Sequence, residues 1–150
     1  MVLLGGRSQV LRSAPVELRF LYVGSANTER DLASWLALPD ARVRWRFQAF
    51  GADVAAVDTA AAPVVLLADH RPAGSVLPIY AVADLDATGA RLNQAGWALE
   101  AGPLGTPEGP ASVWRDASGT SIALLRVDRP DAMDSAYVDD ANTHAVRPKS

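Results

Sequence analysis

The spacing of hydrophobic residues changes twice between Val76 and Trp97. An apolar run from Leu77 to Val82 is typical of a β-strand, and the spacing that follows is that of an amphipathic helix. Asp84 is the predicted N-cap of this helix, because its side-chain oxygen accepts a hydrogen bond from a free amide of the first turn. Gly96 supplies the left-handed residue that commonly ends a helix. The stretch therefore predicts a strand, a capped helix and a stop.

Three more strands follow this helix, separated by turns rich in glycine and proline. The first half of the chain shows the same order of elements, and its helix is predicted to begin at Asn27 or Thr28 and to end at Pro39. The strands of this half are predicted at 16–23, 42–50, 53–57 and 63–69, and the later ones of the second half at 97–102, 111–116 and 121–127. The halves also form a weak internal repeat, in which the segment LRFLYVGSANTERDLASWL is similar to LPIYAVADLDATGARL.

This repeat divides the chain into four parts. Residues 1–15 lack periodicity and are expected to form a loose N-terminal arm. Residues 16–75 form the first β-α-β-β-β module and residues 76–128 the second. Residues 129–150 are expected to form a flexible C-terminal tail that is disordered or lies on the surface.

The composition limits the classes of function. The chain has 150 residues, of which 49% are hydrophobic, and its net charge of −3 provides no basic surface for nucleic acid. The absence of cysteine excludes disulfides, thiolate metal sites and cysteine nucleophiles. No apolar run is long enough for a signal peptide or a membrane span, so we expect a cytoplasmic protein with no membrane partner.

The second module resembles the C-terminal module of the vicinal oxygen chelate superfamily, which includes glyoxalase I, extradiol dioxygenases and bleomycin-resistance proteins. The resemblance lies in a strand that ends in V-x-D-L-D, a helix that ends in Ala-Gly-aromatic, a Gly-Pro loop, and the run WRDASGTSI. With the internal repeat it covers residues 16–128. It implies an α+β fold in which two tandem β-α-β-β-β modules form a cup-shaped mixed sheet that holds the ligand.

The resemblance also implies a divalent metal, held by His and Glu side chains early in the first strand and late in the last strand of each module. The aligned positions here carry apolar side chains that cannot bind a metal. These positions are Leu18, Leu66, Leu77 and Ala123. Glu17 lies one residue from the first of them, but strand alternation predicts that it points to the opposite face. We therefore expect no metal and no other cofactor.

Other catalytic arrangements are missing from the sequence. The only histidines are His70, just after a predicted strand, and His144, in the predicted tail. No serine lies in a strand-to-helix elbow, and the glycines form no phosphate-binding loop. We expect no catalytic residue. The alternative is a lyase or dioxygenase-like enzyme of the superfamily with metal residues at other positions.

If the aligned positions face the cup, alternation brings further apolar and aromatic side chains to the same surface. The expected ligand-binding residues are Leu18, Phe20, Tyr22, Trp45, Phe47, Leu66, Leu77, Ile79, Trp114 and Ala123. Such a lining suits an aromatic or polycyclic ligand, through buried area and ring stacking. Each of the aromatic residues could instead belong to the core or to a dimer interface.

Several arginines interrupt the predicted strands. Arg42, Arg44 and Arg46 alternate with apolar residues, which predicts a comb of arginines on one strand face. This face is either solvated or holds an anionic ligand or partner. Arg19 and Arg115 could also balance a negative group of a ligand.

The sequence thus predicts a metal-independent, homodimeric protein that binds a small apolar or aromatic molecule, similar to the bleomycin-resistance branch. The enzyme described above is one alternative. The other is a non-catalytic interaction domain without a pocket.

Overall fold

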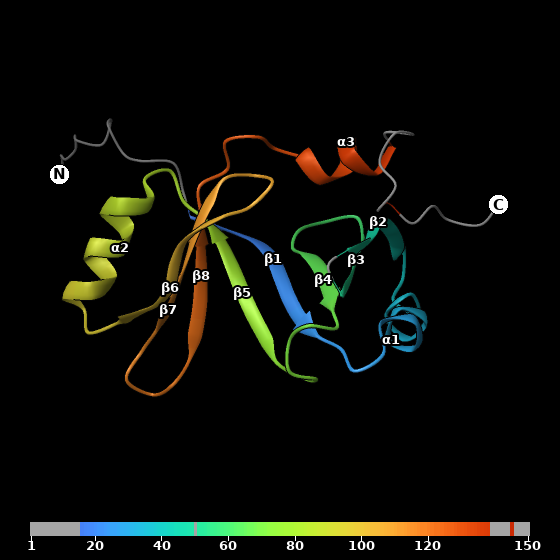
Figure 1. Ribbon diagram of the computed structural model, residues 1–150, viewed down its shortest axis with the longest axis horizontal. Coiled ribbons are helices and arrows are strands. Elements are labelled where there is room, and N and C mark those ends of the chain that lie inside the picture. Colours follow the sequence, from blue (N-terminus) through green and yellow to red (C-terminus); the bar gives the residue numbers. More distant parts are fainter. Residues whose placement is uncertain (1–15, 50, 139–144, 146–150) are drawn as a thin grey trace, which may run out of the picture.

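The computed structural model describes residues 16–49, 51–138 and 145. It contains one mixed sheet of eight strands in the order β2-β3-β4-β1-β5-β8-β7-β6 (Figure 1). Strands β1 and β5 pair antiparallel at the centre and join the two halves. Within each half the first strand pairs parallel with the last, β1 with β4 and β5 with β8. The predicted α+β class, with two consecutive β-α-β-β-β units in a curved sheet, is confirmed.

The first unit begins its helix where the sequence predicts. Asn27 is the N-cap, and its Oδ1 accepts a hydrogen bond of 3.0 Å from the backbone N–H of Arg30. The elements of this unit are β1 (Glu17–Gly24), α1 (Thr28–Trp35), β2 (Arg42–Ala49), β3 (Ala52–Asp58) and β4 (Val64–Ala68).

The helix of the second unit also begins and ends where the sequence predicts. Asp84 caps the helix by accepting a hydrogen bond of 2.9 Å from the backbone N–H of Ala87, and Gly96 follows the helix with a φ of 103°. The elements are β5 (Val76–Ala81), α2 (Leu85–Gln94), β6 (Ala98–Gly105), β7 (Pro110–Arg115) and β8 (Ser121–Leu125). Both caps and the glycine stop are therefore confirmed.

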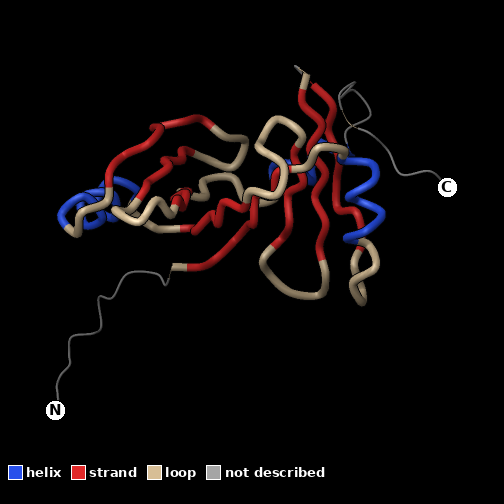
Figure 2. The backbone as a smooth tube through the Cα atoms, turned by 90° about the horizontal axis from the view of Figure 1, so that it is seen from below, coloured by secondary structure: helices blue, strands red, loops and turns tan. Residues whose placement is uncertain are grey.

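The two faces of the sheet carry separate apolar cores. Helices α1 and α2 cover one face, called here the outer face, and they lie at opposite ends of the molecule with the strands between them (Figure 2). The opposite face, called the inner face, holds a third cluster, called the inner cluster. Its members are Trp45, Phe47, Val54, Ala56, Val64, Leu66, Met133 and Ala145.

The structure corrects part of the predicted flexible tail. Residues Ala132–Val138 form a third helix, α3, which packs on β2, and Met133 enters the inner cluster. Ala145 forms an isolated antiparallel bridge with Phe47. The rest of the tail beyond α3, and the predicted arm at 1–15, lie outside the described residues.

Within the part of the chain that the structure describes, no helix is long and apolar enough to cross a membrane.

Candidate functional site

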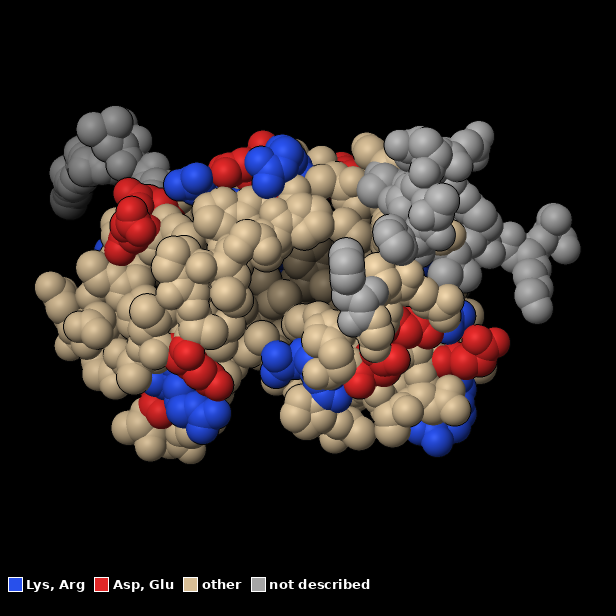
Figure 3. Space-filling view, viewed as in Figure 1, with Lys and Arg blue, Asp and Glu red and all other residues tan. Residues whose placement is uncertain are grey.

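The inner face encloses a cavity of about 720 Å³. The space-filling view shows a hollow near the middle of this side of the molecule, walled mainly by uncharged residues (Figure 3). Strands of both halves form its floor, and its walls come from the loops at 58–62 and 105–108 and from residues 131–134. Its apolar lining includes Phe20, Tyr22, Trp45, Phe47, Val54, Leu66, Ile79, Ala111, Ala123, Leu125 and Met133.

A β-bulge in β1 brings an arginine into this cavity. Leu18 pairs with Tyr80 of β5 and Phe20 with Ile79, so Arg19 is an extra residue on β1. A bulge re-aims side chains because it interrupts strand alternation. Arg19 and Phe20 consequently both line the cavity. The expectation that Leu18 lines it is wrong, because the bulge leaves Leu18 on the same face as Tyr80, which packs in the core under α2.

A second bulge does the same in β2. Val43 pairs with Val57 of β3 and Trp45 with its neighbour Ala56, which makes Arg44 the extra residue. Val43 packs against the outer core, whereas Arg44 and Trp45 both line the cavity.

The predicted comb of three arginines on one strand face is therefore wrong. Arg42 and Arg44 line the cavity. Arg46, on the other side of the bulge, is absent from the lining, and its guanidinium donates to Asp53 at 2.9 and 2.7 Å and to Glu29 at 3.3 Å. The bulge separates the two groups because it shifts the alternation of β2 by one residue.

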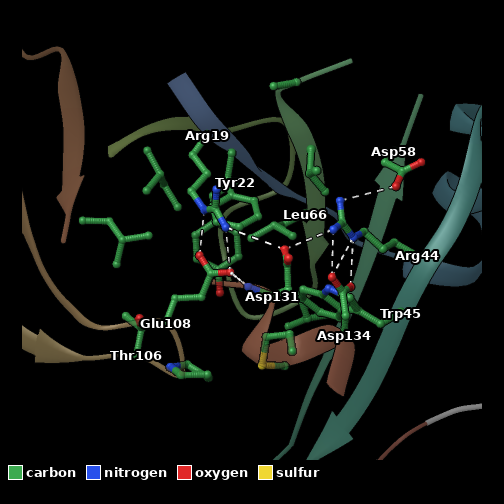
Figure 4. A pocket seen from close by; sticks show the side chains of 18 of the residues that line it. Arg19, Tyr22, Arg44, Trp45, Asp58, Leu66, Thr106, Glu108, Asp131 and Asp134 are labelled. Atoms are coloured by element: carbon green, nitrogen blue, oxygen red, sulfur yellow. Dashed lines mark hydrogen bonds and ion pairs between the residues drawn. The ribbon is translucent and has the colours of Figure 1, made fainter. Parts of the chain in front are cut away.

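Arg19 is held by a carboxylate from the second half of the chain. Its Nε donates to Glu108 Oε1 at 2.7 Å and its Nη2 to Oε2 at 3.0 Å, while the backbone N–H of Asp131 donates to the same carboxylate at 3.1 Å (Figure 4). Glu108 is only 6% exposed. The hydrogen bonds that Arg19 donates to Glu108 raise the pKa of Arg19 against the opposing effect of burial. The guanidinium therefore stays charged in this partly buried position.

Arg44 is held mainly by α3. Its Nε donates to both oxygens of Asp134 at 2.9 and 3.0 Å, and its Nη2 donates to Asp134 Oδ2 at 2.8 Å and to Asp131 at 3.2 Å (Figure 4). A more distant oxygen of Asp58 lies 3.5 Å from Nη1. The hydrogen bonds that Arg44 donates to Asp134 raise the pKa of Arg44. Asp131 also lies 3.9 Å from Arg19, so it stands between the two guanidiniums.

Tyr22 places a phenol in the cavity lining. Its hydroxyl and His70 Nε2 are 2.5 Å apart, and the guanidinium of Arg71 lies 5.3 Å from the centre of its ring. Burial raises the pKa of Tyr22, and the nearby charge of Arg71 opposes this shift. His70 itself is exposed and does not line the cavity.

The other sequence-predicted residues divide between the two faces. Phe20, Trp45, Phe47, Leu66, Ile79 and Ala123 line the cavity. Leu77 pairs with Tyr22 and so lies on the same face, but it is only 4% exposed and is not part of the lining. Trp114 is a correction: it lies under α2 on the outer face, and its Nε1 donates to Ser112 Oγ at 2.9 Å. Its neighbour across the sheet is Ile122, and in β8 it is Ala123 and Leu125 that face the cavity.

The residues present do not fit the divalent metal that the resemblance to the vicinal oxygen chelate superfamily implies. Of the four aligned positions, Leu66 and Ala123 face the cavity and are apolar, and Leu18 and Leu77 do not line it. Among the described residues, no three His, Cys, Asp or Glu side chains form a group that could hold a metal. Glu108, Asp131 and Asp134 are engaged with arginines instead.

Glu17 corrects one step of the sequence analysis. It was predicted to point away from the cup, but it lines the cavity, because the bulge at Arg19 places residues 17 and 19 on the same side as Phe20. Glu108, Asp131 and Asp134 were not predicted as site residues. They come from a loop and from the tail, where no spacing relates them to the strands.

No family model matches the sequence, and no curated protein matches it. Solved structures do match the fold. A hypothetical protein from Bacillus halodurans C-125 has a TM-score of 0.65 at 7% identity, covering 77% of this chain and 97% of that one. Methylmalonyl-CoA epimerase from Mycobacterium tuberculosis has a TM-score of 0.59 at 16% identity, covering 85% of this chain and 97% of that one.

A variant of the Streptomyces coelicolor methylmalonyl-CoA epimerase, in complex with 2-nitronate-propionyl-CoA, has a TM-score of 0.60 at 14% identity and covers 75% of this chain and 98% of that one. At these identities the likeness shows the fold alone. The chain shares the fold of these structures, which is consistent with the cupped mixed sheet that the resemblance in the sequence implied.

Proposed function

We propose that this protein binds a small, largely apolar or aromatic molecule in the cavity of the inner face, without a metal. The observation that carries the proposal is the cavity itself. Its volume of about 720 Å³ lies within the range of roughly 300–1,000 Å³ that is usual for small-molecule sites. More than half of its lining residues are aromatic or otherwise apolar, and arginines and carboxylates that largely pair with one another make up most of the rest. This combination supports an antibiotic-like or other aromatic ligand, as in the bleomycin-resistance branch.

The ion pairs support binding without a metal. A carboxylate that already neutralises a guanidinium would have to leave it in order to bind a metal, and the abandoned arginine would then lie beside a second cation. The positions at which the superfamily binds its metal are apolar in this chain. We therefore place metal-independent binding ahead of the enzyme alternative, and the cavity favours it over an interaction domain without a pocket.

The indole signals of the four tryptophans provide a test. All four are described, and only Trp45 lines the cavity. In a ¹⁵N-labelled sample, millimolar 2-naphthol, a neutral aromatic probe, is expected to shift the Trp45 indole N–H resonance through its ring current. The Trp45→Phe variant assigns that signal. The matched variant Trp114→Phe assigns a tryptophan on the opposite face, whose signal is expected to stay unchanged.

A filled cavity is the complementary test. Ala123 is 4% exposed and faces the cavity from β8, so Ala123→Phe places a ring in the space that a ligand would use. We expect 2-naphthol binding to be lost while melting shows a folded protein, at a cost within the roughly 1–3 kcal/mol usual for added volume. Unchanged binding in this variant would contradict the proposal.

Metal content is tested separately by elemental analysis of the purified protein. We expect no stoichiometric divalent ion, because the aligned positions cannot bind one. About one equivalent of nickel, zinc, manganese or iron per chain would favour the enzyme alternative over the metal-independent proposal.

A further inference from the structure

Asp134 contacts the guanidinium of Arg44 with the geometry that the carboxylate of a ligand would adopt. Its Nε and Nη2 both donate to the carboxylate of Asp134, the closest contact being 2.8 Å. Two parallel N–H donors on one carboxylate form the strongest and most specific arrangement available to arginine. The carboxylate belongs to α3, which follows both β-α-β-β-β units in the chain. Asp131, just before α3, adds a second carboxylate between Arg44 and Arg19.

The helix that carries Asp134 is less firmly packed than the segments that carry the other carboxylates near these arginines. Among the described elements it contacts β2 alone, and Met133 is its described side chain in the inner cluster. An element that contacts a single neighbouring element has a low local contact density, and such elements open at a low free-energy cost. Glu108 and Asp58, by contrast, are 6% and 4% exposed and lie in a loop tied to Arg19 and at the end of β3.

The carboxylates of this segment also line the cavity. Asp131, Met133 and Asp134 are part of its wall, and Arg19 and Arg44 face the same space (Figure 4). If α3 moved away, the Nε and Nη2 donors of Arg44 would lose their partner and would be open to the cavity, next to Trp45. An anionic ligand in the cavity could then accept from these donors, while Nη1 stays near Asp58, which lies 3.5 Å away.

We propose that Asp134, with Asp131, is an internal substitute for a ligand carboxylate, and that the cavity takes an aromatic molecule with a carboxylate group that replaces Asp134 at Arg44. This inference rests on the proposed function and adds the chemical class of the ligand and a control on its entry. The exchange replaces one carboxylate by another, so the charge of Arg44 is paired in both states. Ligand binding and closure of α3 then compete for the same guanidinium.

Two probes of matched shape test the exchange: 2-naphthoate, which carries the carboxylate, and 2-naphthol, which is neutral. Asp134→Asn weakens the internal competitor and is expected to tighten 2-naphthoate by about fivefold or more, the lower end of ordinary coupling between two sites. The affinity for 2-naphthol is expected to change less than that for 2-naphthoate, because 2-naphthol has no carboxylate to pair with Arg44. Arg44→Gln is expected to remove the preference for 2-naphthoate over 2-naphthol. Titration calorimetry measures all affinities, and thermal melting verifies that each variant is folded.

A matched control lies on the same strand. Arg46 and Asp53 form a pair of similar geometry, with contacts of 2.9 and 2.7 Å, but outside the cavity. Asp53→Asn therefore removes an arginine–aspartate pair from β2 without freeing Arg44, and both affinities are expected to stay at the wild-type level. Amide hydrogen exchange in Ala132–Val138 is expected to accelerate with 2-naphthoate and not with 2-naphthol.

The outcomes separate the two proposals. If 2-naphthol binds, two results overturn the carboxylate exchange and leave the proposed function standing: no preference for 2-naphthoate in Asp134→Asn, or the same 2-naphthoate affinity in the wild type and in Asp134→Asn. Equal tightening in Asp134→Asn and Asp53→Asn also overturns it, because the effect would then not depend on Arg44. Failure of both probes to bind the wild type and the Asp134→Asn variant counts against the proposed function itself, and the exchange falls with it.

Discussion

Arg19 and Arg44 show how a single residue can change the chemistry of an apolar sheet. Each is followed by an aromatic residue, and in each pair both side chains face the cavity. The guanidinium of Arg19 lies 5.3 Å from the centre of the Phe20 ring, and Trp45 meets Phe47 edge to face at 5.7 Å. The flat rings provide buried apolar surface, and the neighbouring arginines provide charge at its edge. The cavity therefore suits a ligand with both properties.

Tyr22 is expected to make the free energy of unfolding depend on pH above about pH 10. Its pKa is raised by burial, so the folded state resists ionisation at a pH where the unfolded chain ionises. The free energy of unfolding should therefore be unaffected by Tyr22 below about pH 10, the ordinary pKa of the phenol. It should fall as the pH rises from there through the higher pKa of the folded state.

The measurement is a titration of phenolate absorbance, with unfolding by urea at each pH. The chain has three tyrosines, and Tyr22→Phe is expected to remove a late step and to flatten the decrease in stability above pH 10. A late step that persists in Tyr22→Phe would show that the shifted phenol is a different one.

At the scale of elements, helix α2 and strand β7 are fitted to each other through Gly89. A Cβ atom at this position would lie 2.9 Å from Cζ2 of Trp114, which is closer than side chains pack. Glycine inside a helix costs about 1 kcal/mol relative to alanine. Glycine is needed here because the ring of Trp114, which is buried under the helix and hydrogen-bonded to Ser112, occupies the space that a Cβ atom would take.

Gly89→Ala is therefore expected to lower the free energy of unfolding by about 1–2 kcal/mol, since the clash outweighs the gain in helix propensity. Urea unfolding measures the change. In a Trp114→Phe background, where the smaller ring leaves room, the same substitution is expected to stabilise the protein by up to about 1 kcal/mol. A stabilising effect in the wild-type background would show that the ring moves aside freely.

At the scale of the whole molecule, the sheet ends in two strands with different surroundings. The β2 end is covered in part by α3, and Phe47 is bridged by Ala145. Strand β6 pairs only with β7 among the described strands, and it exposes 51% of Leu99 and 47% of Leu104. An open edge with exposed apolar residues favours pairing with another chain. We propose that the protein is a homodimer that covers this edge.

Light scattering at tens of micromolar is expected to give twice the chain mass of 15.8 kDa. Leu104→Lys is expected to give a monomer, because a charge on an edge strand opposes pairing. Leu38→Lys is the matched control, since Leu38 is equally exposed at 47% but lies after α1. A monomeric wild type, or dissociation of both variants alike, would contradict the proposed interface.

The order of elements within the two β-α-β-β-β units, the starts of their helices and the stop at Gly96 could all be predicted from the sequence, whereas α3 could not. These depend on spacing along the chain and on hydrogen bonds between residues a few positions apart, such as that from the N–H of Ala87 to Asp84. The repeat of one β-α-β-β-β unit also followed from the sequence. Most of the apolar lining followed as well, because alternation holds wherever strand pairing is regular.

The polar side of the site depends on contacts between distant parts of the chain. A bulge exists relative to a partner strand, so the sequence of β1 or β2 alone could not show that Arg19 and Arg44 turn inward or that Leu18 turns away. Trp45 and Trp114 both lie on strands, and the register with β3 and β8 placed them on opposite faces. Pairing of Asp134 with Arg44 joins residues 90 positions apart, and no local pattern specifies such a contact.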